Sequence, residues 1–293
     1  MKKLCILIKR HLKLYLKKPV NIVNSMISII VILGLYFLFV REFTITAVID
    51  YGFNSQYNSL FVDQLMVYGL LIVISTTSIL PICNIFVDDK VKGIIKDFIV
   101  APLSKLKIVY SYIFASIIVS LVFTTLSYLI INWFFINYYH LDFNFFNLIN
   151  SLLIIFLSTI IASNLIFIIA IYINSNLSFS NFGNLLGVTI GFFTGVYIPI
   201  GYYPTIIRNI FFYFPLTQTT NMLRVINTNQ TLNNILINYD STTHYLIKEI
   251  FGLRLTFNNY YFDIFKQIIF ILISFLISNL IIFILVKKIE TKK

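Results

Sequence analysis

Charged residues are scarce in this chain. Of its 293 residues, 11% are charged and 59% are apolar, whereas soluble domains carry about 25% charged residues. This composition excludes an ordinary soluble globular domain and indicates a membrane protein with several spans.

Cysteine and histidine are rare, and a nucleotide-binding loop is missing. Cys5 and Cys83 both fall near the side predicted below to be cytoplasmic, so we expect no structural disulfide. The three histidines, His11, His140 and His244, lie far apart and suggest no metal site. Because no Gly-x-x-x-x-Gly-Lys sequence occurs, we expect that this chain does not bind ATP itself. We also expect no cofactor or metal in it and no enzymatic activity of its own.

Six uncharged apolar stretches are long enough to cross a bilayer. About 20 helical residues at 1.5 Å each span roughly 30 Å of hydrocarbon. Only the polar sequence Asn174–Ser178 separates the fourth stretch from the fifth. The sequence therefore predicts an all-α membrane protein, one transmembrane domain over 1–293, with spans near 22–40, 64–87, 108–136, 147–173, 182–201 and 266–286.

Lysine and arginine predict the orientation of these spans. Sixteen of the 22 Lys and Arg residues fall in 1–21, in 88–107 or after the last stretch. With six spans these three segments share one side of the membrane, and positive charge marks the cytoplasmic side. We expect a bacterial-type plasma (inner) membrane protein with both termini in the cytoplasm.

Two segments flank the spans. Residues 1–19 have an apolar face (Leu4, Ile8, Leu12, Tyr15) opposite three lysines, which predicts a helix lying in the inner interface; a plain positive anchor is compatible with it. The segment 202–265 is expected outside the cell. Its start is apolar and broken by proline, which suits a pair of half-buried re-entrant helices, with a folded extracellular cap as the alternative.

A glycine repeat marks the fifth stretch. Glycine recurs every four residues, which would place one glycine face on a helix and allow a neighbouring backbone to approach closely. The neighbour belongs either to this chain or to a second subunit, and half of a dimeric pore would need such a contact. The repeat consists of Gly183, Gly187, Gly191 and Gly195.

Ionisable residues are missing from the interiors of the predicted spans. Proton-coupled transporters and most intramembrane hydrolases need such groups, so both classes are disfavoured. Sodium coupling through hydroxyls in Ser75–Ser78 stays open. A transporter with neither a site for a coupling ion nor a nucleotide-binding site must take its energy from a partner.

The charged stretch 88–107 offers a place for that partner. Its apolar residues follow helical spacing, and Pro102 ends the pattern. An amphipathic helix between two spans is a lever that a soluble protein can push; a solvated loop resting on headgroups is the other interpretation. The apolar residues are Val91, Ile94, Ile95, Phe98 and Ile99.

These residues resemble those of a known family. Asp89–Ser104 is similar to the acidic-basic-acidic-x-Gly…Pro-(Ile/Leu/Val)-Ser stretch of ABC-2 type transporter permeases. Gly195–Pro199 with Pro204, and then Pro215–Thr217 with Arg224, resemble the outer end of the family's fifth helix, its re-entrant hairpin and its Pro-Leu-Thr…Arg segment. The resemblance covers nearly the whole chain.

The sequence departs from the family pattern at two positions. Val91 stands where a second acidic residue is usual, and Asn221 where an aspartate is common before the arginine. The first departure puts a specific salt bridge at that position in doubt, though not docking itself.

The resemblance implies the membrane half of an ABC exporter, a homo- or heterodimer working with two ATPase subunits that hold ATP and magnesium. No nucleic acid is expected as a partner. Drug or antibiotic efflux is the most similar branch around Lys96–Pro102; export of lipid-linked polysaccharide and a non-transport role in assembly or as a receptor are the alternatives. The implied coupling residues are Asp89, Lys90, Gly93, Ile94, Phe98 and Pro102, and the implied re-entrant residues are Pro199, Pro204, Pro215 and Arg224.

Overall fold

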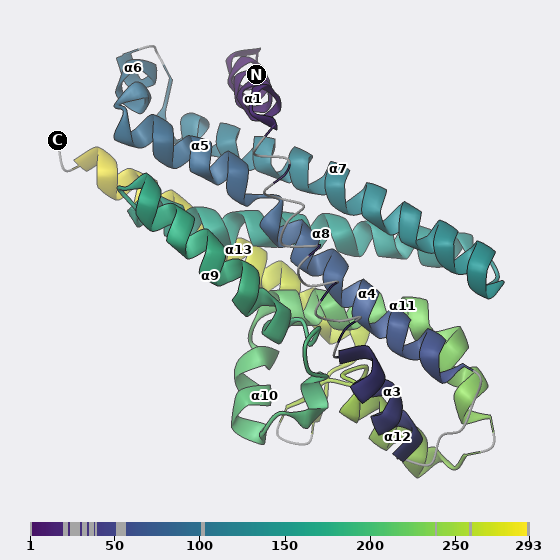
Figure 1. The fold of residues 1–293 in the computed structure, drawn as a ribbon. Coiled ribbons are helices and arrows are strands. Elements are labelled where there is room, and N and C mark those ends of the chain that lie inside the picture. The colour runs from purple at the N-terminus through teal and green to yellow at the C-terminus, as the bar shows by residue number, and fades with distance from the viewer. Residues whose placement is uncertain are drawn as a thin grey trace.

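Long helices lie side by side in this protein and form a bundle (Figure 1). The computed structural model describes residues 2–19, 23, 30, 34, 38, 40–50, 57–100, 103–237, 239–257 and 260–291. The helices over these residues are α1 (Lys2–Lys17), α3 (Arg41–Asp50), α4 (Asn58–Thr77), α5 (Leu80–Val91), α6 (Ile94–Val100), α7 (Lys105–Tyr139), α8 (Phe145–Tyr172), α9 (Asn176–Phe193), α10 (Thr205–Phe212), α11 (Pro215–Leu236), α12 (Ser241–Ile250) and α13 (Ile264–Thr291), with the 3-10 helix η2 at Ile200–Tyr202.

A short antiparallel hairpin completes the described elements. Strands β1 (Thr256–Phe257) and β2 (Tyr260–Tyr261) pair in the register Thr256 to Tyr261. The described fold is otherwise helical, in agreement with the all-α prediction.

Four helical stretches are long and apolar enough to cross a membrane: Asn58–Val91, Lys105–Tyr139, Phe145–Tyr172 and Ile264–Lys288. They coincide with the predicted second, third, fourth and sixth spans. The first predicted span, 22–40, lies outside the described residues except at positions 23, 30, 34, 38 and 40.

Helix α9 occupies the region of the predicted fifth span, with other bounds. We expected it over 182–201, but α9 begins at Asn176, where Ser175 accepts a hydrogen bond from the Ser178 backbone N–H, and ends at Phe193. Gly195 then takes φ +62°, a left-handed conformation that closes a helix. The predicted polar turn lies between α8 and α9. Helix α9 is not among the four stretches that are long and apolar enough to cross a membrane, so a fifth span here stays a prediction.

A polar helix from the predicted external segment packs inside the bundle. The first turns of α11 are buried against α4, α8 and α13. Hydropathy misses such a helix, because it counts polar side chains as exposed even where they donate to backbone carbonyls inside the protein: Thr217 donates to Phe193 O at 2.8 Å and Gln218 to Phe212 O at 2.7 Å. Helices α10 and α11 form the predicted pair; their entry into the membrane stays a prediction.

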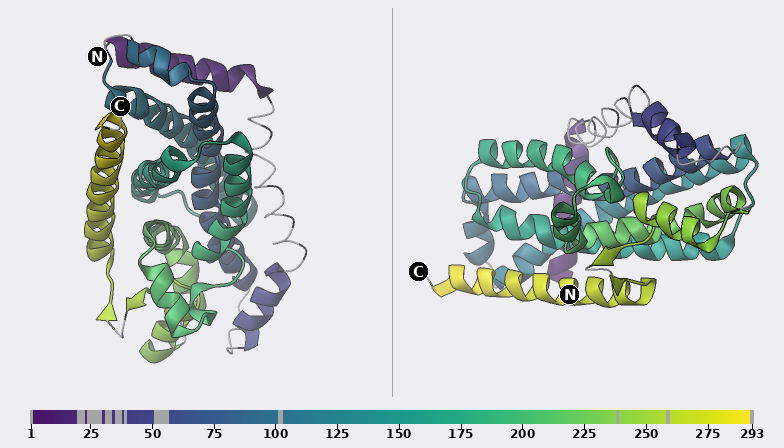
Figure 2. Two further views of the ribbon diagram at one scale, coloured as in Figure 1. Left: turned by 90° about the vertical axis from the view of Figure 1, so that its left-hand side faces the viewer. Right: turned by 90° about the horizontal axis from the view of Figure 1, so that it is seen from below.

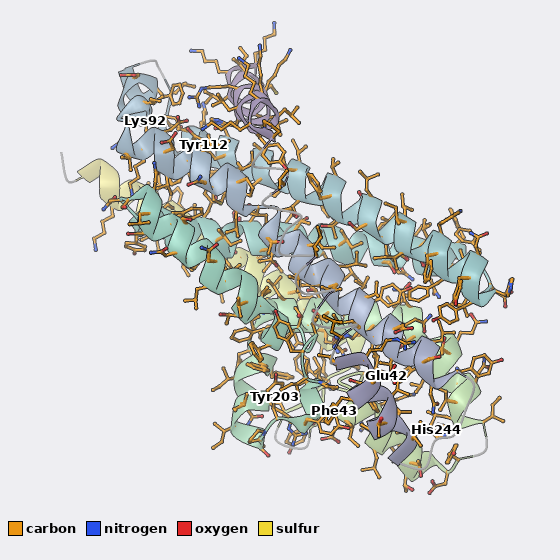
Figure 3. The ribbon with its side chains drawn as sticks, in the orientation of Figure 1. Glu42, Phe43, Lys92, Tyr112, Tyr203 and His244 are labelled. Atoms are coloured by element: carbon orange, nitrogen blue, oxygen red, sulfur yellow. The ribbon has the colours of Figure 1, made fainter. Side chains whose placement is uncertain are left out.

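The two ends of the bundle differ in shape. Helix α1 lies crosswise over one end, where the last turns of α13 also finish (Figures 1 and 2). Lys92 and Tyr112 lie toward this end, and Glu42, Tyr203 and His244 toward the other (Figure 3). We call the first the α1 end. Both described ends of the chain reach it, as the even span count predicts.

Candidate functional site

Helix α1 docks on the bundle through a face shifted from the predicted one, since Tyr15 is buried but Leu4, Ile8 and Leu12 are only half-buried. It contacts α5 and α7, burying Leu7, His11 and Tyr15, while its lysines stay exposed. An amphipathic helix lying across one end of a membrane bundle suits the interface between lipid and water.

A buried carboxylate joins three helices at this end. Asp89 of α5 is 3% exposed. It accepts two hydrogen bonds from Arg10 of α1, at 2.6 and 3.2 Å, and a third from the Tyr112 hydroxyl of α7 at 2.5 Å. A bidentate guanidinium–carboxylate pair fixes orientation as well as distance. We call Arg10, Asp89 and Tyr112 the Asp89 triad.

His11 extends this triad in the neutral form. Its Nδ1 lies 3.3 Å from Arg10 Nη1, which only donates, so Nδ1 accepts and Nε2 carries the proton to Ser111 Oγ at 2.9 Å. The ring stacks on Tyr112 at 3.6 Å between centroids. Burial, and secondarily the charge of Arg10, lowers the pKa of His11 to about 3.

Lys90, one of the predicted coupling residues, joins α5 to the end of α8. Its Nζ donates to Ile171 O at 2.5 Å and Ile173 O at 3.1 Å, at the C-terminal end of α8 where a cation is favourable. Its neighbour Asp88 pairs with Lys92 at 2.7 Å and accepts from Asn176 of α9 at 3.0 Å. The last turn of α5 is thereby tied to α8 and α9.

The amphipathic stripe is not one helix, which corrects the prediction. Helix α5 ends at Val91, and Gly93 has φ +79° before α6 begins at Ile94. Val91 therefore belongs to α5 and is 50% exposed, while Ile94 and Ile95 of α6 are half-buried. Glycine accounts for the break, because other residues rarely adopt this conformation. The side chain of Ile99 lies outside the described residues.

Phe98 connects α6 to the Asp89 triad. Its ring lies beneath the Arg10 guanidinium, 5.0 Å from Arg10 Cζ to the ring centroid, a cation–π contact. One guanidinium therefore contacts α6 and binds the carboxylate that α5 presents to α1 and α7. Pro102 lies outside the described residues, and Ser104 begins α7 by accepting from the Lys107 backbone N–H.

The glycine face of α9 packs within the chain at two of its positions. A Cβ on Gly183 would meet Leu80 at 3.5 Å, and one on Gly191 would lie 2.3 Å from the Tyr197 ring. Gly187 is half-buried, and Gly195 lies beyond the helix, so the four glycines do not share one helix face. A second subunit against this face stays a prediction.

The three predicted prolines each begin a helix. Pro199 precedes η2, Pro204 precedes α10, and Pro215 is the first residue of α11, where a missing N–H costs nothing. Arg224 of α11 is buried beside α4. Arg224 thus brings into the bundle a charge that the predicted spans lack, and it comes from the segment expected outside.

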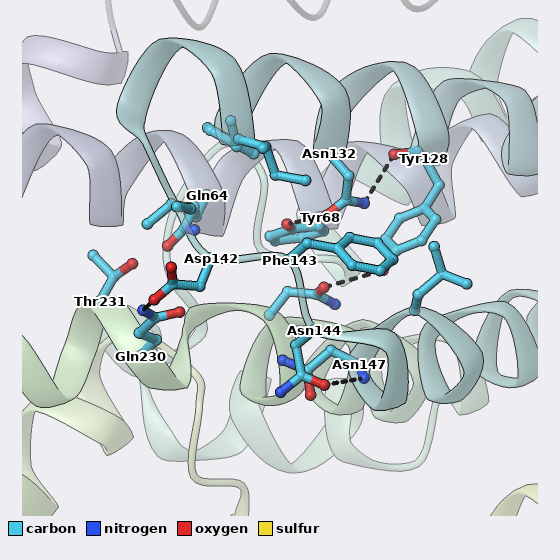
Figure 4. A pocket seen from close by; sticks show the side chains of 15 residues that line it. Gln64, Tyr68, Tyr128, Asn132, Asp142, Phe143, Asn144, Asn147, Gln230 and Thr231 are labelled. Carbon is cyan, nitrogen blue, oxygen red and sulfur yellow. Dashed lines mark hydrogen bonds between the residues drawn. The ribbon is translucent and has the colours of Figure 1, made fainter.

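Among the cavities away from the α1 end, two contrast in size and in the character of their walls. A polar one of about 50 Å³ lies between α4, α7, α8 and α11, with Tyr68, Tyr128 and Asn132 on its walls (Figure 4). An apolar one of about 520 Å³ is lined mainly by α8 and α9. Its two hydroxyls, Thr76 and Thr189, donate to carbonyls of their own helices, so its walls offer almost no free polar group.

Sequence reasoning missed Arg10, His11, Ser111 and Tyr112. Arg10 and Asp89 lie 79 positions apart, and no local pattern joins them. The one available signal was a histidine on the apolar side of an otherwise lysine-rich helix. The hydroxyls of Ser75–Ser78 all donate to backbone carbonyls of α4.

The amino-acid sequence matches one protein family. The family model described as "ABC-2 type transporter" matches residues 2–227, more than half of the chain. No curated protein matches the chain.

Proposed function

Because this chain belongs to the ABC-2 type transporter family, we propose that it is the permease subunit of an ATP-driven exporter whose nucleotide-binding subunit is a separate chain. ATP and magnesium bind to that partner, and this chain catalyses no reaction itself. Family membership and the long apolar helices support a multi-pass membrane protein that works with an ATP-binding subunit.

One observation carries the proposal: Phe98 of α6 contacts Arg10, and Arg10 binds Asp89. A partner that displaces α6 therefore moves α1 and α5 together. Helices α4 and α5 run nearly in line over 34 residues (Figure 1), about 50 Å at 1.5 Å per residue. Movement at the α1 end is carried along this pair to the opposite end.

The proposed orientation puts the α1 end in the cytoplasm of a bacterial-type cell. Single cysteines at Ser104 and Thr242, both exposed, test it after Cys5 and Cys83 are replaced. In intact cells an impermeant thiol reagent should label position 242, and position 104 only after the membrane is opened. Labelling of 104 from outside inverts the topology.

The proposed cargo is amphipathic, drug-like or lipid-like. The apolar cavity of about 520 Å³ beside α9 supports this class, whereas the polar cavity has about 50 Å³. A lipid-linked polysaccharide is the alternative cargo. We propose a dimer, with the cargo path at the subunit interface.

Phe98→Ala tests the coupling proposal. The change removes the contact between α6 and Arg10, a cation–π interaction of about 0.5–2 kcal/mol, so ATP hydrolysis should uncouple from export in proteoliposomes and co-purification of the ATPase should fall. Phe145→Ala is the matched control, since Phe145 is 60% exposed and starts α8 at the opposite end. Full ATPase binding and transport by Phe98→Ala would remove the proposed role of α6.

A further inference from the structure

Arg224 is a buried cation that no carboxylate neutralises. Its side chain is 2% exposed. Its Nε donates to Leu65 O of α4 at 2.7 Å and its Nη2 to Gly195 O, just after α9, at 3.0 Å. None of the ion pairs among the described residues includes Arg224, and its Nη1 has no hydrogen bond there.

Two glycines keep the space around the guanidinium clear. A Cβ on Gly69 would lie 2.5 Å from Nη2, and one on Gly195 would lie 3.1 Å from Nη1. Any other residue at position 69 would collide with the charged group. The charge is therefore seated in a fitted backbone cradle.

A small cavity opens beside this cradle. It measures about 20 Å³ and has mostly apolar walls that include Val62, Val196 and Phe251, beside the hydroxyl of Thr44, which donates to Val40 O. None of the described residues that line it is acidic. A single water needs about 10–15 Å³. The cavity therefore has room for one water or one small ion.

The protein compensates the charge only in part. The C-terminal end of α9 supplies about half a negative elementary charge, and two backbone carbonyls accept two of the guanidinium N–H groups. The remaining N–H groups include both on Nη1. Burying a charge without a partner is costly, so an anion at Nη1 is strongly favoured.

We propose that Arg224 and this cavity form a binding site for a small halide, chloride in the cell, held by Nη1. Apolar walls select ions that release water readily, so bromide binds and sulfate does not. The cavity is too small for a phosphate group, which excludes a lipid headgroup. The bound halide joins α4, α11 and the turn after α9, and this role does not depend on the identity of the cargo.

Bromide gives the direct test on the purified full-length chain. Crystals grown in bromide should show one anomalous peak beside Arg224 Nη1. A featureless site, or a water without anomalous signal, overturns the proposal.

Thermal unfolding gives an independent test. The unfolding midpoint should rise steadily with chloride at constant ionic strength, balanced with gluconate, because a ligand of the folded state stabilises it. Arg224→Gln should lose this dependence, and Arg208→Gln, which changes the nearby arginine paired with Glu249, should keep it. Val196→Leu, which fills the cavity and leaves Arg224 in place, should also lose it and serves if Arg224→Gln does not fold. Equal midpoints in chloride and gluconate contradict the site.

Discussion

Arg10 and Arg224 each join three segments of the chain, but they are held in opposite ways. Arg10, at the α1 end, has a carboxylate, an aromatic ring and a tyrosine network around it. Arg224, toward the other end, has only backbone carbonyls. Arg10 keeps its counter-charge when it moves together with Asp89, so this pair suits the transmission of force between helices. A charge without a counter-charge suits ligand binding.

The largest expected effect comes from breaking the paired end. Arg10→Met leaves Asp89 buried without its counter-charge, and losing one member of a buried pair costs about 3–5 kcal/mol. We expect a large drop in the unfolding midpoint in detergent. Lys92→Met is the control, because the exposed Asp88–Lys92 pair should contribute about 0–1 kcal/mol. Equal effects of the two changes would show that the Asp89 triad does not hold α1.

At Arg224 the next largest effect comes from filling the space around the guanidinium. Gly69→Ala puts a methyl 2.5 Å from Arg224 Nη2 and 2.8 Å from Val196 Cγ2, and such overpacking costs about 1–3 kcal/mol. Gly183→Ala is the matched control, since its Cβ would meet Leu80 at an ordinary 3.5 Å. Thermal unfolding should separate the two; equal midpoints would contradict the cradle.

A smaller effect is expected between the Asp89 triad and α6. Gly93 has φ +79° with open space around it, so Gly93→Ala suffers only from the left-handed backbone, about 1–2 kcal/mol. Gly93→Asn should lose less, because asparagine tolerates this conformation. If unfolding shows alanine and asparagine to be equivalent at position 93, the turn is not left-handed.

An effect of similar size, about 2 kcal/mol between pH 7 and pH 5, should appear as a pH dependence. The pKa of His11 is lowered from 6.5 to about 3, first by burial and then by Arg10. Between these values the unfolded chain binds the extra proton, so stability rises with pH in this window and falls on acidification below 6.5, by up to about 1.4 kcal/mol per pH unit. His11→Gln should remove this slope, which unfolding midpoints from pH 7 to pH 5 can measure. An unchanged slope would place His11 in water.

Features that depend on hydropathy averaged over long stretches could be predicted from the sequence. Features that depend on contacts between residues far apart in the chain could not. Four spans were found because long stretches exclude charge. Helix α1 was found because its apolar period is regular, but its buried face was placed on Leu4, Ile8 and Leu12 instead of Leu7 and His11. Helix α11 was not expected inside the bundle, because hydropathy counts its threonines and glutamine as exposed, whereas Thr217 and Gln218 donate to carbonyls at the ends of α9 and α10.

The candidate site was predicted in outline only. Asp89, Gly93 and Phe98 were selected, but helical spacing cannot detect a glycine with positive φ, so the stripe was drawn through the break before Ile94. The Arg10 partner of Asp89 depends on how α1 folds back over α5. That packing is a tertiary property without a local signal.

Photo-crosslinking tests the central claim, docking of the ATPase on the α1 end, most directly. Benzoylphenylalanine in place of Asp97, which is exposed on α6, should crosslink to the ATP-binding subunit in membranes from cells that hold both chains. The same group in place of Phe145, at the opposite end, should not. A crosslink from position 145, or none from position 97, would contradict the account.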